Sequence, residues 1–226
     1  MKKFALIVAG GSGNRMRAGM PKQFIVLGEK PLLMHTIKAF YDYDGSMRIV
    51  LVLPPAQFDF WKALCDTYSF DIPHCVAAGG ESRFHSVKNG LQLIENEEII
   101  FIHDGVRPLV SRQTIDKCYR QACISGNAVP VVPVSESVRW TDGEKNKPVE
   151  RDCIRLVQTP QTFRAKLIKK AYEQSYSDTF TDDASVVEKL GETIYLTEGN
   201  RENIKITWAE DFAIAVFYMN MKLDNY

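Results

Sequence analysis

The chain has 226 residues, which is enough for one substantial hydrophobic core, and residues 1–226 are expected to form a single domain. Its 28 Lys and Arg residues balance 28 Asp and Glu residues, and this formal net charge of +0 argues against nucleic acid or a membrane surface as a partner. No apolar run approaches the roughly 20 residues that a membrane-spanning helix needs, and the five scattered cysteines contain no Cys-x-x-Cys pair. Reduced thiols of this kind predict a cytoplasmic protein.

Short apolar runs rich in Val and Ile alternate with segments of helical spacing along the chain. The predicted strands cover residues 4–9, 48–53, 74–77, 99–103 and 128–134, and the predicted helices cover residues 31–41, 57–69, 82–95 and 112–125. Strands that are apolar throughout are typical of a sheet buried on both faces. The pattern predicts an α/β fold with a mostly parallel sheet and helices on both faces, in which ligands bind at the carboxyl ends of the strands.

The first predicted strand runs directly into a glycine-rich and basic segment, IVAGGSGNRMRAGMPKQF, at residues 7–24. Gly11 and Gly13 leave backbone N–H groups open to a phosphate, and Arg15 and Lys22 add positive charge within the same loop. The segment lacks the Lys-Ser/Thr pair of a P-loop and the third glycine of a dinucleotide fingerprint. It predicts a triphosphate cradle of another kind, and a surface turn with solvated basic residues is the alternative.

Two further segments place polar groups after predicted strands. In AAGGESRFHSV, the glycine pair that ends at Gly80 allows close backbone approach to a flat ring, and Ser86 can add a hydrogen bond. In IIFIHDGVRP, Asp104 follows a buried strand, where an aspartate holds Mg²⁺ against phosphate oxygens or else serves as a turn or cap residue. His103 is expected to pack beneath the site. Arg107 either binds an anionic substrate or pairs with Asp104, and the sequence leaves both open.

A polar segment after residue 134 interrupts the alternation of strands and helices. Strand-like stretches flank an Asp142-Gly143 turn signal, which predicts a β-hairpin arm at about residues 137–155. An isolated two-stranded ribbon is marginal in water, so the arm is expected to pack on another surface such as a second copy of the chain. A mobile surface loop is the alternative.

Near the C-terminus, two polar segments precede helical patterns. Thr181, in TDDASVVEKLG, is a predicted helix cap. Lys205 lies in the strand-like NIKIT, where an alternating exposed lysine is most simply a solvated residue. Spacing alone gives Lys205 no catalytic role.

Together, the motifs GGxGxRM…PKQ, GG-E-S-R-x-x-S-V, HDGxRP, V-x-R, TPQ-x-F, TDDAS and NIKIT resemble those of the 2-C-methyl-D-erythritol 4-phosphate cytidylyltransferase family, from Phe4 to about Tyr218. The resemblance implies a Rossmann-like fold and transfer of a cytidylyl group from CTP to methylerythritol phosphate, with release of pyrophosphate, on the non-mevalonate route to isoprenoid precursors. It also implies Mg²⁺ as the cofactor and a homodimer whose projecting arms embrace each other.

The resemblance further implies roles for individual residues of this chain. CTP would be bound by Gly11, Gly13, Arg15, Lys22, Gly80 and Ser86. The sugar phosphate would be bound by Arg107, Ser137, Arg151, Thr181 and Lys205. Catalysis would depend on Arg15, Lys22, Arg151 and Lys205, and Asp104 would hold the metal. Arg151 is expected to come from the partner subunit's arm.

The chemistry suits these residue types, because the attacking sugar phosphate is already an oxyanion and needs no general base. The site must position two anions and stabilise the charge that develops on the leaving pyrophosphate.

Two departures from the family pattern are Glu81 in place of Asp, and Ser135, Glu136 and Ser137 in place of Arg-Asp-Thr. The alternatives are a ribitol 5-phosphate cytidylyltransferase and a nucleotide-binding module without turnover; TDDAS argues against the first, and the retained cations argue against the second.

Overall fold

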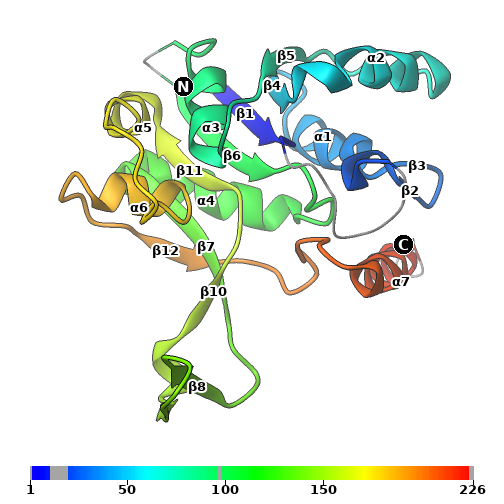
Figure 1. Cartoon of the computed structure of the whole chain (residues 1–226). Coiled ribbons are helices and arrows are strands. Elements are labelled where there is room, and N and C mark those ends of the chain that lie inside the picture. The colour runs from blue at the N-terminus through cyan, green and yellow to red at the C-terminus, as the bar shows by residue number, and fades with distance from the viewer. Residues whose placement is uncertain (1, 11–19, 96–97, 224–226) are drawn as a thin grey trace.

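The computed structural model describes residues 2–10, 20–95 and 98–223, and its centre is a mixed β-sheet with helices on both faces (Figure 1). In the described part of the chain the sheet has eight strands. Seven form a path of hydrogen-bonded neighbours, β10-β7-β11-β6-β1-β4-β5, and β12 also pairs with β7. These strands are β1 (Lys3–Val8), β4 (Arg48–Leu53), β5 (Cys75–Ala78), β6 (Ile99–Asp104), β7 (Asn127–Pro133), β10 (Arg155–Val157), β11 (Gln161–Arg164) and β12 (Leu196–Glu198).

The core of the sheet is parallel, as predicted. Strand β1 lies between β4 and β6 and runs parallel to both, and β4 runs parallel to β5. The carboxyl ends of these four strands therefore meet at one edge. Strand β11 is antiparallel to β6 and β7, which makes the sheet mixed beyond β6.

Side chains alternate along β1 and bury both faces of the sheet. Ala5 and Ile7 pack against α1 (Leu32–Tyr43), α2 (Phe58–Thr67) and α4 (Arg112–Ser125). Phe4 and Leu6 pack against α3 (Arg83–Leu91), α5 (Ala165–Ala171) and α6 (Asp183–Glu188). The helix α7 (Ala209–Leu223) packs through Ala215 in a smaller cluster that includes Leu27 of the short ribbon β2 (Val26–Leu27) and β3 (Lys30–Pro31). Short 3-10 turns are η2 (Lys22–Phe24), η3 (Pro55–Gln57) and η4 (Arg151–Cys153).

Two local predictions near the C-terminus are wrong. Helix α6 begins after Asp182, because the Asp182 carboxylate accepts the backbone N–H of Ser185 at 2.9 Å while the Ser185 hydroxyl accepts the Asp182 N–H at 3.1 Å. Thr181 lies one residue before this reciprocal cap. The segment 203–207 forms no strand, since Ile206 N–H bonds to Val106 O without a continuing ladder, and β12 lies earlier, at Leu196–Glu198.

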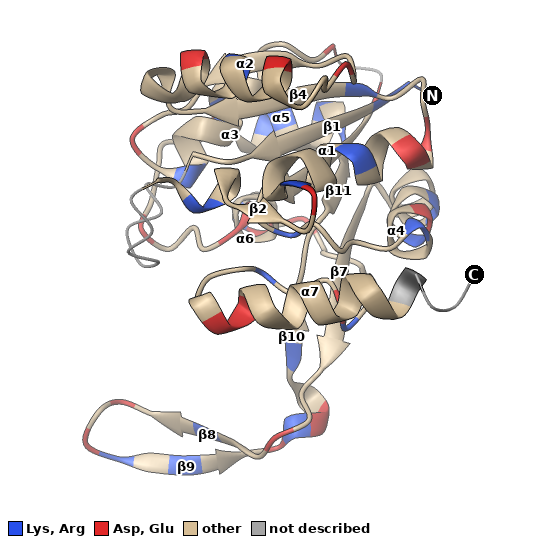
Figure 2. Ribbon diagram, turned by 90° about the vertical axis from the view of Figure 1, so that its right-hand side faces the viewer, with Lys and Arg blue, Asp and Glu red and all other residues tan. Residues whose placement is uncertain are grey.

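The predicted hairpin arm is confirmed. Strands β8 (Val138–Thr141) and β9 (Asn146–Val149) pair in antiparallel register around a turn in which Gly143 has φ 101°. The Asp142 carboxylate accepts the N–H groups of Glu144 and Lys145 and closes the turn. The arm projects from the body below β7 and β10 and carries both basic and acidic residues (Figures 1 and 2).

Two further observations concern membrane-spanning helices and disulfide bonds. Within residues 2–10, 20–95 and 98–223, no helix combines the length and apolar character that membrane crossing requires. The five cysteines are all free thiols.

Candidate active site

Glycines at the ends of β1 and β5 meet around Ser86, on the first turns of α3. The Ser86 hydroxyl accepts the Gly80 N–H at 3.0 Å, and a Cβ built at Gly10 would lie 3.2 Å from Ser86 Oγ. A Cβ at Gly80 would lie only 2.4 Å from the Cβ of His85, so this turn admits glycine alone without rearrangement. The structure thus brings together two of the predicted CTP residues, Gly80 and Ser86.

The loop that follows Gly10 is described only from residue 20 onward. Three of its predicted phosphate-binding residues, Gly11, Gly13 and Arg15, lie outside the described residues. Lys22 is described, and its Nζ donates to the carbonyl of Ile206 at 2.9 Å. This contact places Lys22 beside the segment that carries Lys205.

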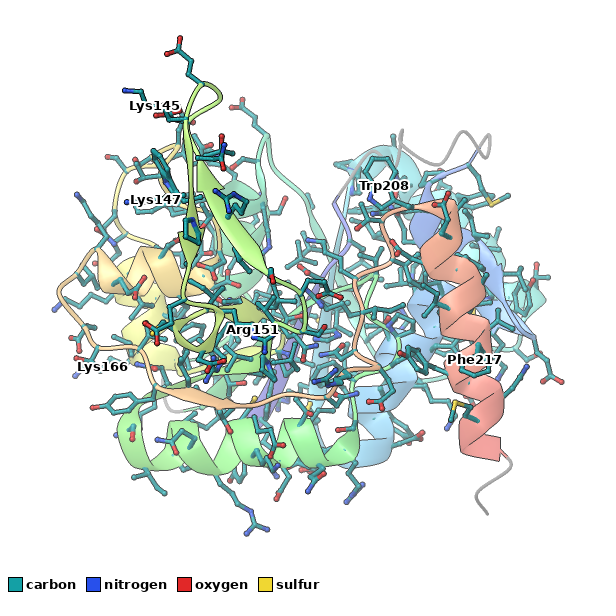
Figure 3. All side chains as sticks on the ribbon, turned by 90° about the horizontal axis from the view of Figure 1, so that it is seen from below. Lys145, Lys147, Arg151, Lys166, Trp208 and Phe217 are labelled. Carbon is teal, nitrogen blue, oxygen red and sulfur yellow. The ribbon has the colours of Figure 1, made fainter. Side chains whose placement is uncertain are left out.

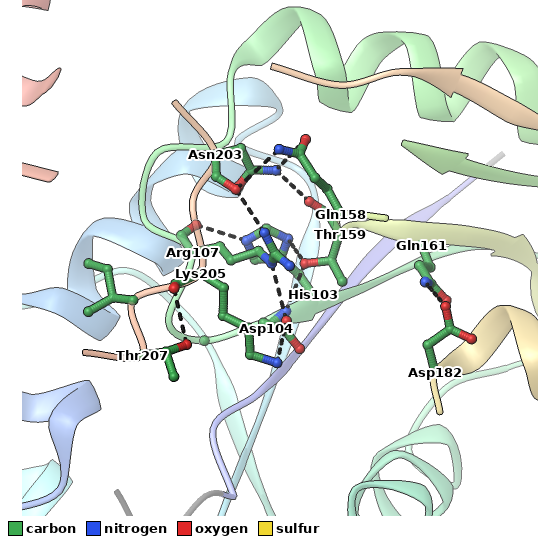
Figure 4. A network of polar contacts seen from close by, with 12 residues as sticks. His103, Asp104, Arg107, Gln158, Thr159, Gln161, Asp182, Asn203, Lys205 and Thr207 are labelled. Atoms are coloured by element: carbon green, nitrogen blue, oxygen red, sulfur yellow. Dashed lines mark hydrogen bonds and ion pairs between the residues drawn. The ribbon is translucent and has the colours of Figure 1, made fainter. Parts of the chain in front are cut away.

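Asp104, at the end of β6, is surrounded by cations (Figure 4). Its Oδ2 lies 3.2 Å from Arg107 Nε and 3.2 Å from Lys205 Nζ, and its Oδ1 lies 3.6 Å from Arg83 Nε. Only 10% of the Asp104 side chain is exposed. Burial raises the pKa of this carboxyl, but Arg83, Lys205 and Arg107 outweigh that effect and hold the pKa well below its usual range. Asp104 is therefore ionised at neutral pH, and it is also the first residue of a turn, since the Arg107 N–H donates to the Asp104 carbonyl at 3.1 Å.

A chain of hydrogen bonds beneath Asp104 fixes its backbone. The Asp104 N–H donates to Thr159 Oγ1 at 3.1 Å, the hydroxyl of Thr159 meets His103 Nδ1 at 2.9 Å, and His103 Nε2 meets the Arg107 carbonyl at 3.0 Å. Because a carbonyl only accepts, Nε2 carries the proton and Nδ1 accepts from Thr159. Burial lowers the pKa of His103 to about 4, which keeps the ring neutral at pH 7. His103 packs beneath the site, as predicted.

Buried amides hold the segment before Lys205. Asn203 Nδ2 donates to the carbonyl of Thr159 at 2.8 Å, and the Asn203 carbonyl accepts from Arg107 at 2.8 Å. Gln158 Nε2 donates to the carbonyl of Asn200 at 2.9 Å. Sequence reasoning gave no role to these amides, although both lie in quoted motifs or directly beside one.

Arg83 is a second functional candidate that sequence reasoning missed. It is the first residue of α3 and forms a bidentate ion pair with Asp183, at 2.8 and 2.6 Å. Asp183 follows Asp182, and Asp182 accepts from Gln161 at 2.7 Å (Figure 4). These contacts bring the segment that carries Thr181, whose side chain is exposed, toward the Asp104 side of the sheet.

Two predicted site residues lie on the arm and contact the arm. Arg151 donates to the carbonyl of Ser135 at 3.0 Å, lies 3.9 Å from the Asp152 carboxylate, and has 55% of its side chain exposed. Ser137 is also exposed, at the base of β8. Figure 3 shows Arg151 near the base of the arm, with Lys145 and Lys147 toward its tip. Among the described contacts, neither residue joins the Asp104 cluster of its own chain.

Asp104 fits a divalent cation in a limited way. In the part of the chain that the structure describes, no group of three or more His, Cys, Asp or Glu side chains is arranged to hold a metal. Oδ1 is the less engaged oxygen of Asp104, with its cation at 3.6 Å against two at 3.2 Å on Oδ2. One carboxylate oxygen combined with phosphate oxygens and waters is a common Mg²⁺ site. The donors suit Mg²⁺ carried by a nucleotide and do not form a protein cage.

A cavity of about 690 Å³ lies elsewhere, between α1, α7 and residues 108–112. None of the predicted site residues lines it, and Lys38 pairs with Asp42 in its wall at 2.7 Å. The convergence of cations, glycines and strand ends therefore places the candidate site at Asp104.

Replacement of Thr159 by Val tests the hydrogen-bond chain. Val has the shape of Thr but leaves the Asp104 N–H and His103 Nδ1 without their partner, so the free energy of unfolding should fall by ~2 kcal/mol or more in urea denaturation. Thr162→Val is the matched control, since that buried hydroxyl contacts the Pro160 carbonyl at 3.4 Å and the Cys118 thiol, and neither contact belongs to the chain beneath Asp104. Equal losses in the two variants would contradict the assigned role of Thr159.

Comparisons with known proteins identify the family of this chain. The model of the family described as 2-C-methyl-D-erythritol 4-phosphate cytidylyltransferase matches residues 4–221. A Bacteroides fragilis protein of that name is 52% identical over 215 residues, which cover 95% of this chain and 98% of the relative. A Geobacillus thermodenitrificans protein of that name is 40% identical over 214 residues, which cover 93% of this chain and 94% of the relative. The crystal structure of the Thermus thermophilus protein of that name superposes with a TM-score of 0.80 at 30% identity, covering 97% of this chain and all of that one. The chain belongs to the 2-C-methyl-D-erythritol 4-phosphate cytidylyltransferase family.

Proposed function

We propose that this protein transfers a cytidylyl group from CTP to 2-C-methyl-D-erythritol 4-phosphate and releases pyrophosphate, on the non-mevalonate route to isoprenoid precursors. The observation that carries the proposal is the cluster of Arg83, Arg107 and Lys205 around the buried Asp104, beside the Gly80–Ser86 turn. Such a cluster suits a reaction between two phosphate anions. The five free thiols suit a reducing compartment, and the proposed location is the cytoplasm.

In this proposal the nucleotide spans the carboxyl ends of β1, β5 and β6. Gly80 and Ser86 contact the cytosine ring in this proposal, and the hydrogen bond of 3.0 Å from the Gly80 N–H to the Ser86 hydroxyl holds the two together at one turn. The triphosphate lies along the loop that supplies Gly11, Gly13 and Arg15. Lys22 neutralises charge on the triphosphate as the bond to pyrophosphate breaks.

The second substrate brings its own nucleophile. An oxygen of the sugar phosphate attacks the α-phosphorus of CTP, one P–O bond forms, and the bond to pyrophosphate breaks, so no side chain has to remove a proton. Lys205 and Arg107 position this phosphate. Thr181 contacts the same substrate. Asp104 holds Mg²⁺, which when bound neutralises charge on the phosphate oxygens.

The arm supplies the remaining contacts in this proposal. Ser137 and Arg151 are exposed on a hairpin that leaves the body, and a twofold homodimer would place each arm over the other subunit's site. The polar composition of the arm supports this reading, because a two-stranded ribbon has little core of its own.

An assay of pyrophosphate release tests the reaction. We expect rapid release with CTP and methylerythritol phosphate, and at least tenfold slower release with ribitol 5-phosphate or with the other nucleoside triphosphates. The measurement is a coupled pyrophosphate assay over all nucleotide and sugar-phosphate pairs. Preference for ribitol 5-phosphate would replace the substrate assignment, and absence of turnover with every pair would favour a binding module.

Substitution of Asp104 by Asn tests the metal assignment. Asn keeps the shape but removes the charge, so the Mg²⁺ concentration for half-maximal turnover should rise about tenfold or more, because one charged ligand is lost. The check is a Mg²⁺ titration of initial rates, with circular dichroism to confirm folding. An unchanged titration curve in a folded variant would assign Asp104 to structure alone.

Mixing two inactive variants tests the sharing of the site. Each subunit of Lys22→Ala has a damaged body, and each subunit of Arg151→Ala has a damaged arm. A mixed dimer would contain one site with both defects and one intact site. With random exchange half of the dimers are mixed, so activity should return to about a quarter of the wild-type value by twofold symmetry.

The two variants incubated separately, and mixed without subunit exchange, are the controls for that experiment. Mixed dimers confirmed by mass spectrometry that stay inactive would show that Arg151 serves its own chain.

A further inference from the structure

Arg83 faces two carboxylates at once. Its two terminal nitrogens donate to Oδ1 and Oδ2 of Asp183 at 2.8 and 2.6 Å, and its Nε lies 3.6 Å from Asp104 Oδ1. The planar guanidinium makes this possible, because its five N–H donors point in fixed directions. Whatever fixes the terminal nitrogens therefore also fixes the direction of Nε.

Asp183 is held firmly from its other side. None of its surface is exposed, and the Tyr172 hydroxyl donates to its Oδ1 at 2.6 Å. It is also the first residue of α6, directly after the reciprocal cap formed by Asp182 and Ser185. Asp183 can therefore act as a fixed anchor for Arg83.

We propose that Arg83 is a positioning residue of the site. Asp183 and Tyr172 fix its guanidinium, so that Nε stands 3.6 Å from Asp104 Oδ1 and orients the carboxylate by its charge, while Arg107 and Lys205 contact Oδ2. The inference rests on the proposed cytidylyl transfer, and it adds a residue that acts through Asp104. Since Arg83 begins the helix that carries Ser86, the same contact fixes the base-binding turn relative to the carboxylate.

Simple removal of Arg83 cannot test this role. It would leave Asp183 as a buried charge without its cation, and loss of folding would hide any effect on the site. A paired substitution, Arg83→Met with Asp183→Asn, removes both charges together. The Asn side chain still offers an oxygen to the Tyr172 hydroxyl.

The paired variant should stay folded and lose turnover. We expect a melting temperature within a few degrees of wild type and a kcat lower by about 10- to 100-fold, the size of effect that misplacement of a reacting group produces. The matched control is Lys3→Met with Asp44→Asn, which removes another partly buried ion pair, of 2.6 Å, at the start of β1. Its kcat should stay within about twofold of wild type.

Two more measurements are needed. One separates the geometry of Arg83 from its charge, and the other tests Arg83 independently of the proposed reaction. Arg83→Lys keeps the positive charge but lacks the planar set of N–H donors, so its kcat should remain well below that of the wild type. A kcat equal to that of the wild type would overturn the positioning role. Calorimetry of CTP binding needs no turnover. Mg²⁺ should increase the affinity of the wild-type protein for CTP, and in the paired variant this increase should be at least threefold smaller.

The outcomes are distinguishable. A wild-type protein without pyrophosphate release on any sugar phosphate would sink the proposed function, and the binding measurement would still decide the role of Arg83. A folded paired variant with kcat within threefold of wild type and an unchanged response of CTP affinity to Mg²⁺ would overturn the role of Arg83. If the paired variant does not fold, Arg83→Lys decides by the same two criteria.

Discussion

Asp104 carries a full negative charge at the end of a central strand with only 10% of its side chain exposed. A buried carboxylate is unfavourable unless cations and hydrogen bonds compensate it. The three compensating cations come from separate parts of the chain: the start of α3, the turn after β6, and the segment before α7. Those parts must meet for the charge to be tolerated, so this one interaction ties the architecture of the site to the stability of the fold.

The same arrangement explains why the site is cationic although the chain is neutral overall. Arg107 and Lys205 share one oxygen of Asp104, so the cluster keeps more positive than negative charge at the strand ends. In the proposed reaction, an arriving phosphate takes over part of these contacts without a change in the backbone, because the backbone of Asp104 is fixed by Thr159 and His103. Preorganisation of this kind reduces the cost of binding two anions side by side.

Sequence patterns predicted the elements that depend on local periodicity. The apolar runs of β1, β4 and β6 and the hairpin around Gly143 follow from residue types alone. Strand β12 and the irregular path of the Lys205 segment were missed, because both depend on distant partners. Strand β12 pairs with Val129–Val131, and the Lys205 segment is held by Arg107 and Thr159, which bond to Asn203. Arg83 was visible in a quoted motif, but its two carboxylates lie 21 and 100 residues away, and spacing carries no sign of such contacts. Where Gly11, Gly13 and Arg15 lie stays a prediction.

The segment that carries Lys205 is joined to the body mainly through side chains. A backbone hydrogen bond runs from Ile206 to Val106, and side-chain contacts come from Asn203, Lys205, Arg107, Gln158 and Lys22. The segment is thus held without a sheet ladder, and its fully buried side chains, Asn203 and Ile206, anchor it in the body. Lys22 and Lys205 both take part in these contacts, so a ligand that binds either lysine also changes how the segment is held. The candidate site and the fold are therefore coupled, because displacement of this segment would also withdraw Lys205 from the buried Asp104 carboxylate.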